Sequence, residues 1–240
     1  MMRALQHSID FFFERIGLVV LFSIPFFFAL LIPTFVSTPS YLALGGVFLR
    51  TGSIPEVGAF EAAVAAFAYL VSLFIISDSI ANINVLIKSK RTLTTATKRV
   101  WKALGTHAVN IFLVYTIATI LVLIFQLVTF DLPLRGIILP LLMLFLSFAL
   151  FFVPPAIVID ERQPWHAVVI SFRMAIRKLD AVLSWMVLGL VMLTAGEFVL
   201  LFLPYPLGQY ATLLFNSVVV IPFLLIYQTH IYMKKYGLAY

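Results

Sequence analysis

The sequence predicts an all-α polytopic membrane protein with six transmembrane helices. Of its 240 residues, 63% are hydrophobic and 11% are charged, and the mean hydropathy is +1.11. A soluble domain is about 45–50% apolar and about 25% charged, so this chain has too few polar side chains to cover a water-facing surface. A membrane β-barrel would need alternating apolar and polar residues in strands of about ten, and no such alternation is present. A bundle of apolar helices is therefore the predicted fold.

Six apolar runs are close to the length of about 20 residues that a membrane-spanning helix needs. They cover residues 16–36, 60–87, 108–128, 134–158, 181–203 and 210–232. The first run is longer than the apolar core of a secretory signal, which has about 7–15 residues, and a polar helix-like segment precedes it. We therefore interpret it as a retained span, and we expect one transmembrane domain over residues 1–240.

The positions of the basic residues predict the orientation in the membrane. Fourteen of the sixteen Lys and Arg residues lie before the first run, after the sixth, or in the two long segments that follow the second and fourth runs. Only Arg50 and Arg135 lie in the segments on the other side. Because basic residues concentrate in cytoplasmic loops, both termini are predicted to lie on the cytoplasmic side of the cell membrane. The net charge of +6 is then explained by topology, which argues against nucleic acid as a partner.

Three cytoplasmic segments have the periodicity of amphipathic helices. They run from Met2 to Phe13, from Leu93 to Leu104 and from Trp165 to Leu179, and Pro164 is suited to the first turn of the third. Each is expected to lie in the inner headgroup layer, with its apolar face toward the acyl chains. The basic residues expected to bind anionic lipid headgroups there are Arg91, Lys98, Arg99, Lys102, Arg173, Arg177 and Lys178.

Each amphipathic segment precedes two apolar runs, which predicts three repeats of one helix and a two-span hairpin. The repeat units cover about residues 1–87, 92–158 and 163–232. The second and third units align weakly, for example Ala96 with Ala167 and Trp101 with Phe172. The first unit has a longer outer segment, in which we expect Tyr41–Leu49 to form a short helix, either on the outer surface or re-entrant.

Residues 152–178 resemble a pattern of a broad group of prokaryotic six-span membrane proteins. In that pattern a span ends in a proline and a small apolar run, and an acidic residue, an alanine, a serine and a basic amphipathic helix follow. The matching positions here are Pro155, Asp160 or Glu161, Ala167, Ser171 and Arg173. The group includes the membrane domain associated with glycerophosphoryl diester phosphodiesterases. These 240 residues do not contain the phosphodiesterase domain, so the resemblance implies the fold and not that activity.

Few ionisable residues fall inside the predicted spans. Asp78 lies in the second run, and Asn82 shares its helix face because it is four residues further on, whereas Asn84 points elsewhere. Glu197 lies late in the fifth run. A charge at the centre of a span costs at least about 2.5–3.5 kcal/mol on insertion scales, so such residues are functional candidates by default. The structural alternative is a hydrogen bond to a neighbouring helix.

No enzyme motif is found, so we expect no catalytic activity and no cofactor or metal. The chain has no cysteine, and its histidines, His7, His107, His166 and His230, lack the spacing of metal ligands. Asp160 and Glu161 are consecutive acidic residues at a helix start, where negative charge favours the helix dipole.

Two functions are favoured for a protein of this kind, and an intramembrane enzyme is a third alternative. The first is a small transporter or channel-like conduit with Asp78, Asn82 and Glu197 along part of the path. The alternative is a membrane scaffold or accessory protein that binds anionic lipid or a cytoplasmic partner through its basic helices. The predicted partner in both cases is the lipid bilayer, with anionic lipids in its inner leaflet, and both functions are compatible with a homo-oligomer.

Overall fold

The computed structural model describes residues 2–36, 40–44, 47–51, 59–92, 104–130, 132, 135–200, 202–204 and 207–234. In these ranges the regular secondary structure is helical except for one two-stranded hairpin. Among these residues, five helices or helix pairs are long and apolar enough to cross a membrane, and there are six if the bent pair α1 (Met2–Glu14) and α2 (Ile16–Val36) is counted as one span. The prediction of a helical membrane protein with several spans is therefore confirmed.

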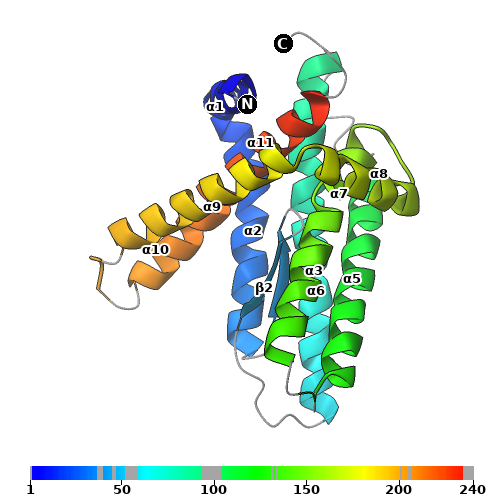
Figure 1. Cartoon of the computed structure of the whole chain (residues 1–240). Helices are drawn as coiled ribbons and strands as arrows, with labels where there is room; N and C mark the ends of the chain where they lie inside the picture. The colour runs from blue at the N-terminus through cyan, green and yellow to red at the C-terminus, as the bar shows by residue number, and fades with distance from the viewer. Residues whose placement is uncertain are drawn as a thin grey trace.

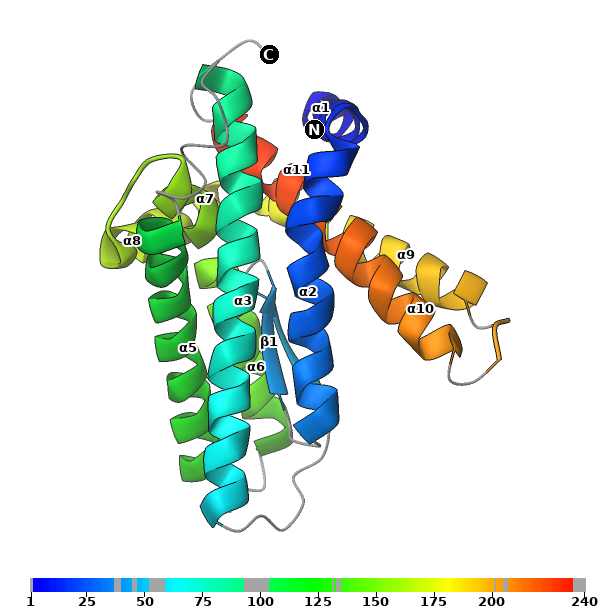
Figure 2. The same ribbon diagram turned by 180° about the vertical axis from the view of Figure 1, so that it is seen from behind.

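Four helices run side by side and form a bundle: α2, α3 (Ala59–Thr92), α5 (Val109–Val128) and α6 (Arg135–Leu150) (Figures 1 and 2). They are apolar around most of their circumference, as expected for helices that face both lipid and other helices. With 34 residues, α3 is about 51 Å long at 1.5 Å per residue, well above the roughly 30 Å of hydrocarbon in a bilayer. The helix therefore extends beyond the apolar layer.

Shorter helices gather at one end of the bundle, which we call the inner end because the sequence predicts that this end faces the cytoplasm. There α1 bends by 90° from α2 and packs against α11 (Ile221–Met233). The short α7 (Val153–Val158) and the amphipathic α8 (Pro164–Arg177) lie beside the inner end of α5 (Figure 1). Two of the three predicted amphipathic helices are thus present, and α8 begins with Pro164 as expected. The remaining one, predicted from Leu93 to Leu104, lies outside the described residues except for its last residue. That residue begins the π-helical turn η1 (Leu104–Ala108), which leads into α5.

A helical hairpin projects from the bundle at an oblique angle, and we call it the arm. It is formed by α9 (Leu179–Leu200) and α10 (Leu207–Phe215), which lie antiparallel and apart from α5 and α6 (Figures 1 and 2). A π-helical turn, η2 (Asn216–Val220), joins α10 to α11, so the last described span changes from an exposed helix in the arm to a buried one in the bundle. Every residue of α11 is buried.

The outer segment of the first hairpin is not helical, and the expectation of a helix over Tyr41–Leu49 is wrong. Strand β1 (Ser40–Leu44) pairs antiparallel with β2 (Val47–Thr51), with Leu44 opposite Val47. The two strands lie between α2 and α6, beside α3 (Figures 1 and 2). In the sequence, a Gly-Gly dipeptide separates two apolar runs here, which is a signal for a two-residue hairpin that the helical interpretation overlooked.

The apolar core is densest toward the inner end. Phe151 and Phe152 form the turn between α6 and α7, and both are fully buried. The ring of Phe151 lies 5.0 Å from that of Trp185 on α9, and the ring of Phe152 lies 5.8 Å from that of Tyr232 on α11. This aromatic cluster joins the bundle, the base of the arm and α11 into one packed unit, on which the polar groups described next are held.

Candidate functional site

The predicted pair of polar residues in the second span is formed. On α3, the amide Nδ2 of Asn82 donates a hydrogen bond of 3.0 Å to Oδ2 of Asp78, as their spacing of four residues allows. Asn82 is only 6% exposed, whereas Asp78 is half-buried. Two oxygen atoms of this pair, Asp78 Oδ1 and Asn82 Oδ1, are buried without a hydrogen-bond donor among the described residues. The pair therefore presents two buried oxygen atoms that accept no hydrogen bond from the described residues.

Asn84, on another face of α3, is different because both ends of its amide are used. Its Nδ2 donates to the carbonyl of Ile80 at 2.8 Å, and its Oδ1 lies 2.8 Å from the hydroxyl of Thr229 on α11. Buried polar groups with partners of this kind hold membrane helices together. Asn84 is thus a structural contact between α3 and α11. Its two hydrogen bonds contrast with the neighbouring Asp78 and Asn82, whose Oδ1 atoms have no donor among the described residues.

The third residue proposed for a conduit lies elsewhere. Glu197 is in the last turn of α9, on the exposed surface of the arm, and α9 runs away from α3 (Figure 1). Within one chain the structure brings Asp78 and Asn82 together and leaves Glu197 apart from them.

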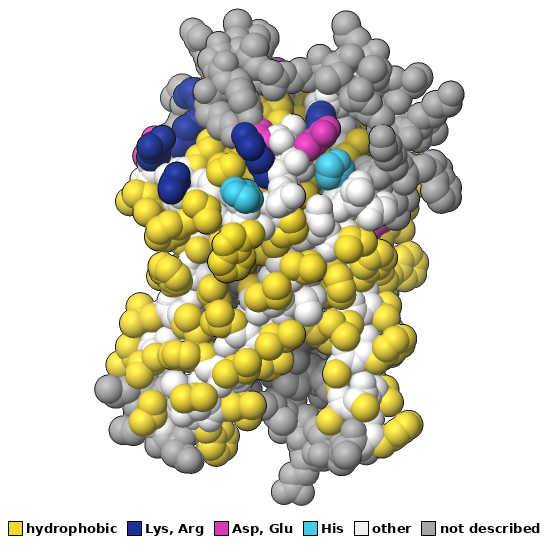
Figure 3. Space-filling model, turned by 90° about the vertical axis from the view of Figure 1, so that its right-hand side faces the viewer, with side chains coloured by type: hydrophobic (Ala, Val, Ile, Leu, Met, Phe, Trp, Pro, Cys, Tyr) yellow, Lys and Arg dark blue, Asp and Glu magenta, His cyan; other side chains and the backbone are white. Residues whose placement is uncertain are grey.

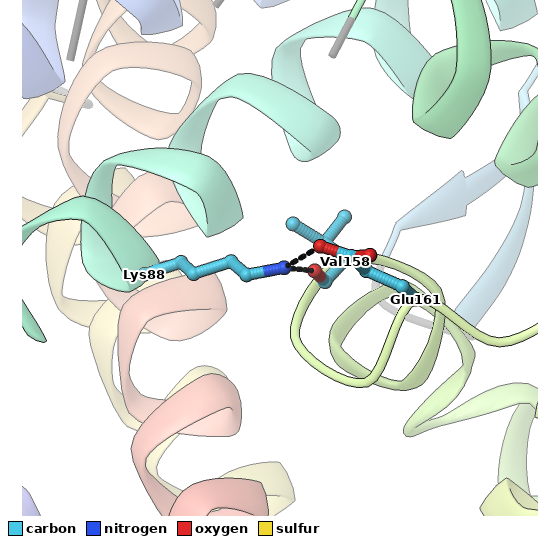
Figure 4. Close-up of polar contacts among 3 residues, drawn as sticks. All are labelled: Lys88, Val158 and Glu161. Carbon is cyan, nitrogen blue, oxygen red and sulfur yellow. Dashed lines mark hydrogen bonds and ion pairs between the residues drawn. The ribbon is translucent and has the colours of Figure 1, made fainter. Parts of the chain in front are cut away.

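A second polar contact ties α3 to the turn between α7 and α8, and we call it the inner clasp. The Nζ atom of Lys88 lies 2.7 Å from the carbonyl oxygen of Val158 and 2.8 Å from Oε1 of Glu161 (Figure 4). Val158 is the last residue of α7, so its carbonyl has no partner within the helix and attracts a cation. The Lys88 side chain is 19% exposed and that of Glu161 is 69% exposed. The lysine is consequently the buried half of the clasp, and the glutamate is its solvent-facing half.

Glu161 occupies a strained backbone position, because its φ of 54° lies in the left-handed region that residues with a side chain rarely adopt. The preceding residue, Asp160, accepts a hydrogen bond of 2.8 Å from the hydroxyl of Tyr232 on α11. The two acidic residues therefore serve as contacts to α3 and α11, and the helix dipole of α8 alone does not account for them. Sequence reasoning missed this role because both partners are more than 70 residues away.

The inner end of α11 receives further contacts from α1 and from the residue that follows α8. Nδ1 of His230 lies 3.0 Å from the hydroxyl of Ser8 on α1. Nζ of Lys178, which follows α8, donates to the carbonyl of Ile231 at 3.4 Å. Lys178 was predicted to bind lipid headgroups, and the structure adds this contact to α11. These bonds fix α1 and the end of α8 against the bundle.

The amphipathic helix α8 has three distinct faces. Its buried face packs on the bundle through Ala167, Ser171, Met174 and Ala175. Its apolar strip, at spacings of four and seven residues, consists of the exposed Trp165, Val169 and Ile176. Its basic strip, at spacings of seven and four residues, consists of the exposed His166, Arg173 and Arg177. One helix thus carries an exposed apolar strip beside an exposed basic strip.

The apolar strip of α8 continues the apolar surface of the bundle. Between Val169 and Ile176, the ring of Phe172 lies 5.8 Å from that of Phe145 on α6, which is itself exposed. Figure 3 shows the basic side chains gathered at the inner end, above a surface that is mainly hydrophobic. A membrane-surface helix has this arrangement, with apolar side chains toward the acyl region and basic ones toward the headgroups. The remaining predicted headgroup residues lie outside the part described at side-chain level: Arg91, Lys98, Arg99 and Lys102.

Fold and site together define a helical membrane protein with a polar inner end. Comparisons with protein families, with curated proteins and with solved structures find no match to this chain. The likeness of residues 152–178 to the phosphodiesterase-associated group therefore stays a prediction.

Proposed function

We propose that the protein binds anionic lipid headgroups at the cytoplasmic membrane surface and acts there as a membrane scaffold or accessory protein. The observation that supports this function best is the pair of exposed strips on α8, one apolar with Trp165 and one basic with Arg173 and Arg177. A basic residue near an anionic membrane surface contributes about 1 kcal/mol of attraction. An exposed tryptophan is also typical of the boundary between headgroups and acyl chains.

Lipid selectivity tests this function directly. The full chain is reconstituted in bilayers, and its preference for spin-labelled phosphatidylglycerol over phosphatidylcholine is measured by electron paramagnetic resonance at low and high salt. We expect the double variant Arg173→Gln/Arg177→Gln to lose up to roughly thirty-fold in selectivity at low salt, since two contributions of about 1 kcal/mol are removed. The matched control is Arg15→Gln/Lys234→Gln, which removes two exposed charges that are not on α8. An equal loss in both double variants would show an effect of net charge alone and would refute a role for α8.

The orientation proposed with this function places both termini and α8 in the cytoplasm, in a chain of three repeats and six spans. Because the chain has no cysteine, a single cysteine introduced by Lys234→Cys is the only thiol that a reagent can label. Labelling of intact cells by a membrane-impermeant maleimide should fail at this position and succeed after the membrane is opened. Labelling of intact cells would reverse the proposed orientation.

A conduit is the second candidate function, and the Asp78–Asn82 pair is the observation that favours it. A carboxylate within a span, with one buried oxygen atom that has no donor among the described residues, is the arrangement expected where a solute or ion is contacted. The test is flux across proteoliposomes with Asp78→Asn, with Ser79→Ala as the matched control. Ser79 is the next residue on α3, and its hydroxyl donates only within its own helix, to Ile75 at 3.0 Å. Flux that is measurable in the wild type and equal in both variants would exclude Asp78 from the path.

A further inference from the structure

The two arginines of the basic strip on α8 lie one helical turn apart. Arg173 and Arg177 are both exposed, and four residues separate them. At 1.5 Å per residue their positions are offset by about 6 Å along the helix, and they lie within about 40° of each other around it. Side chains at this spacing are neighbours on one helix face. A single small ligand can therefore contact both guanidinium groups.

Neither guanidinium group forms an ion pair with a carboxylate among the described residues. In this they differ from Arg15, which lies 3.8 Å from Glu14, and from Lys88 in the inner clasp. Lys178, the next cation along the chain, donates to the carbonyl of Ile231 on α11. The two arginines are thus the part of this basic surface that faces outward as a pair.

The chemistry of two neighbouring guanidinium groups favours one kind of anion. Each group is a planar fork of N–H donors that binds two phosphate oxygens at once. A phosphate monoester has three terminal oxygens and carries a charge of about −1.5 to −2 at pH 7, so it can match both forks and both positive charges. A phosphate diester, as in phosphatidylglycerol, has two terminal oxygens and one negative charge, and it would leave one arginine for a second lipid.

The surroundings of the pair favour a lipid as the source of the phosphate. Each arginine directly follows an apolar residue of α8, and these residues are Phe172 and Ile176. The ring of Phe172 lies 5.8 Å from that of Phe145 on α6, and Ile176 is 55% exposed. The basic side chains lie at the inner end, beside a surface that is mainly hydrophobic (Figure 3). A ligand at the arginines would therefore have its acyl chains against apolar side chains.

We propose that Arg173 and Arg177 together bind one phosphate monoester headgroup of a membrane lipid, with phosphatidic acid as the probe. This inference rests on the proposed function, since it names the headgroup that α8 prefers among anionic lipids. The proposed function requires only the positive charge of the strip, whereas the shared phosphate requires both guanidinium forks.

The test compares two anionic lipids on the full chain in phosphatidylcholine bilayers. Spin-labelled phosphatidic acid and phosphatidylglycerol are measured by electron paramagnetic resonance at about pH 8, where most of the monoester is doubly charged. The wild type should prefer phosphatidic acid over phosphatidylglycerol by roughly three- to ten-fold. Arg173→Lys/Arg177→Lys keeps both charges and removes both forks, so it should lose most of this preference and still select both anionic lipids over phosphatidylcholine. The matched control is Arg15→Lys/Arg162→Lys, at two exposed positions outside α8, which should change neither ratio.

Single variants test whether one phosphate is shared. Arg173→Gln and Arg177→Gln should each remove most of the preference for phosphatidic acid over phosphatidylglycerol, and the double variant should lose little more. If the loss in the double variant equalled the product of the two single losses, the arginines would act independently on separate lipids, and the proposal would be overturned. Both positions are exposed, so an unchanged helix content is expected in every variant.

The failure of this inference and that of the proposed function can be told apart. Equal binding of the two anionic lipids, both above phosphatidylcholine, would overturn the shared phosphate site and leave the proposed function intact. No preference for either over phosphatidylcholine would refute both. Retention of the wild-type ratio by the double lysine variant would show that charge alone selects the lipid. Inorganic phosphate, exchanged for chloride at constant ionic strength, should not displace phosphatidic acid, and displacement would refute a lipid as the ligand.

Discussion

The inner half of α3 and the arm are both membrane helices, but they differ in what their side chains contact. From Ile76 to Ile87, α3 is buried at every position except Asp78, and its asparagines and serines are turned into the protein. In the arm, α9 buries few side chains beyond small ones and Trp185, and α10 buries none. Specific polar contacts therefore define the inner end, whereas close packing of small residues defines the arm. Stability should consequently depend strongly on residues at the inner end and weakly on the exposed surface of the arm.

The largest difference is expected between Phe152→Ala in the core and Leu190→Ala on the arm. Phe152 is fully buried, and its backbone N–H donates to Ser171 at 2.8 Å, whereas Leu190 is 67% exposed. Phe152→Ala should lower the free energy of unfolding by about 2–4 kcal/mol, somewhat less than in a soluble core, because unfolded helices remain in lipid. Leu190→Ala should change it by less than about 0.5 kcal/mol. Unfolding by SDS in mixed micelles measures both, and similar losses would contradict the contrast.

The next largest loss of stability is expected for replacement of a closely packed glycine in the arm. A Cβ atom at Gly196 would lie 2.7 Å from a ring carbon of Phe215, whereas one at Gly189 would lie 3.3 Å from a flexible leucine side chain. Gly196→Ala should therefore lower stability by about 1–3 kcal/mol, and Gly189→Ala should cost clearly less.

The Gly196→Ala substitution should also push α9 and α10 apart. Spin labels on Val199→Cys and Tyr210→Cys, which are both exposed positions, report the distance between the two helices. An unchanged distance together with unchanged stability would mean that Phe215 rotates away without effect, and that close packing does not define the arm.

Substitution of Lys88 and substitution of Glu161 in the inner clasp should lower the free energy of unfolding by different amounts. Lys88→Met loses the bonds to Val158 and Glu161 and should cost about 1.5–2 kcal/mol, because a bond to a helix-end carbonyl is lost from a mostly buried site. Glu161→Gln should cost less than about 1 kcal/mol, since exposed ion pairs contribute little. High salt should largely remove the loss for Glu161→Gln, whereas the loss for Lys88→Met should shrink only by the share of the ion pair; unfolding at 0.05 M and 0.5 M NaCl checks this. A larger loss for Glu161→Gln would show that the ion pair, rather than the carbonyl bond, holds the clasp.

The smallest effect is expected where the arm meets the bundle. Nε1 of Trp185 donates to the carbonyl of Leu224 at 2.7 Å, and Trp185→Phe removes this bond while it keeps most of the packing. The loss should be about 0.5–1 kcal/mol, the usual range for one hydrogen bond between membrane helices. Trp165→Phe, at an exposed position on α8, is the control and should leave stability unchanged.

The spans were predictable because an apolar run of sufficient length is a direct signal. The runs 16–36 and 108–128 agree with α2 and α5 to within one residue. The run 134–158 is broken in the structure, where α6 ends at Leu150 and α7 begins at Val153, with Pro154 in its first turn. Both sides of this break are apolar, so hydropathy does not reveal it.

The Asp78–Asn82 contact was predictable because it is local, and helical spacing alone brings the two side chains together. The inner clasp was not, since it joins residues 73 positions apart and depends on a left-handed backbone at Glu161. In the sequence, nothing distinguishes Lys88 from the other basic residues that follow the second apolar run. The oblique direction of the arm likewise has no hydropathy signal, because both of its helices resemble those of the bundle.

The docking of α1 on α11 also sets a time scale for assembly. The bond between Ser8 and His230 joins residues 222 positions apart, and Phe12 packs its ring on Phe223 of the same helix. At about 5–20 residues per second, a ribosome needs roughly 10–45 seconds to synthesise the chain between them. During that interval the apolar face of α1 has no protein partner on α11, and the membrane surface is the environment that can shield it. A chaperone that protects this protein during synthesis would therefore be expected to recognise its first helix.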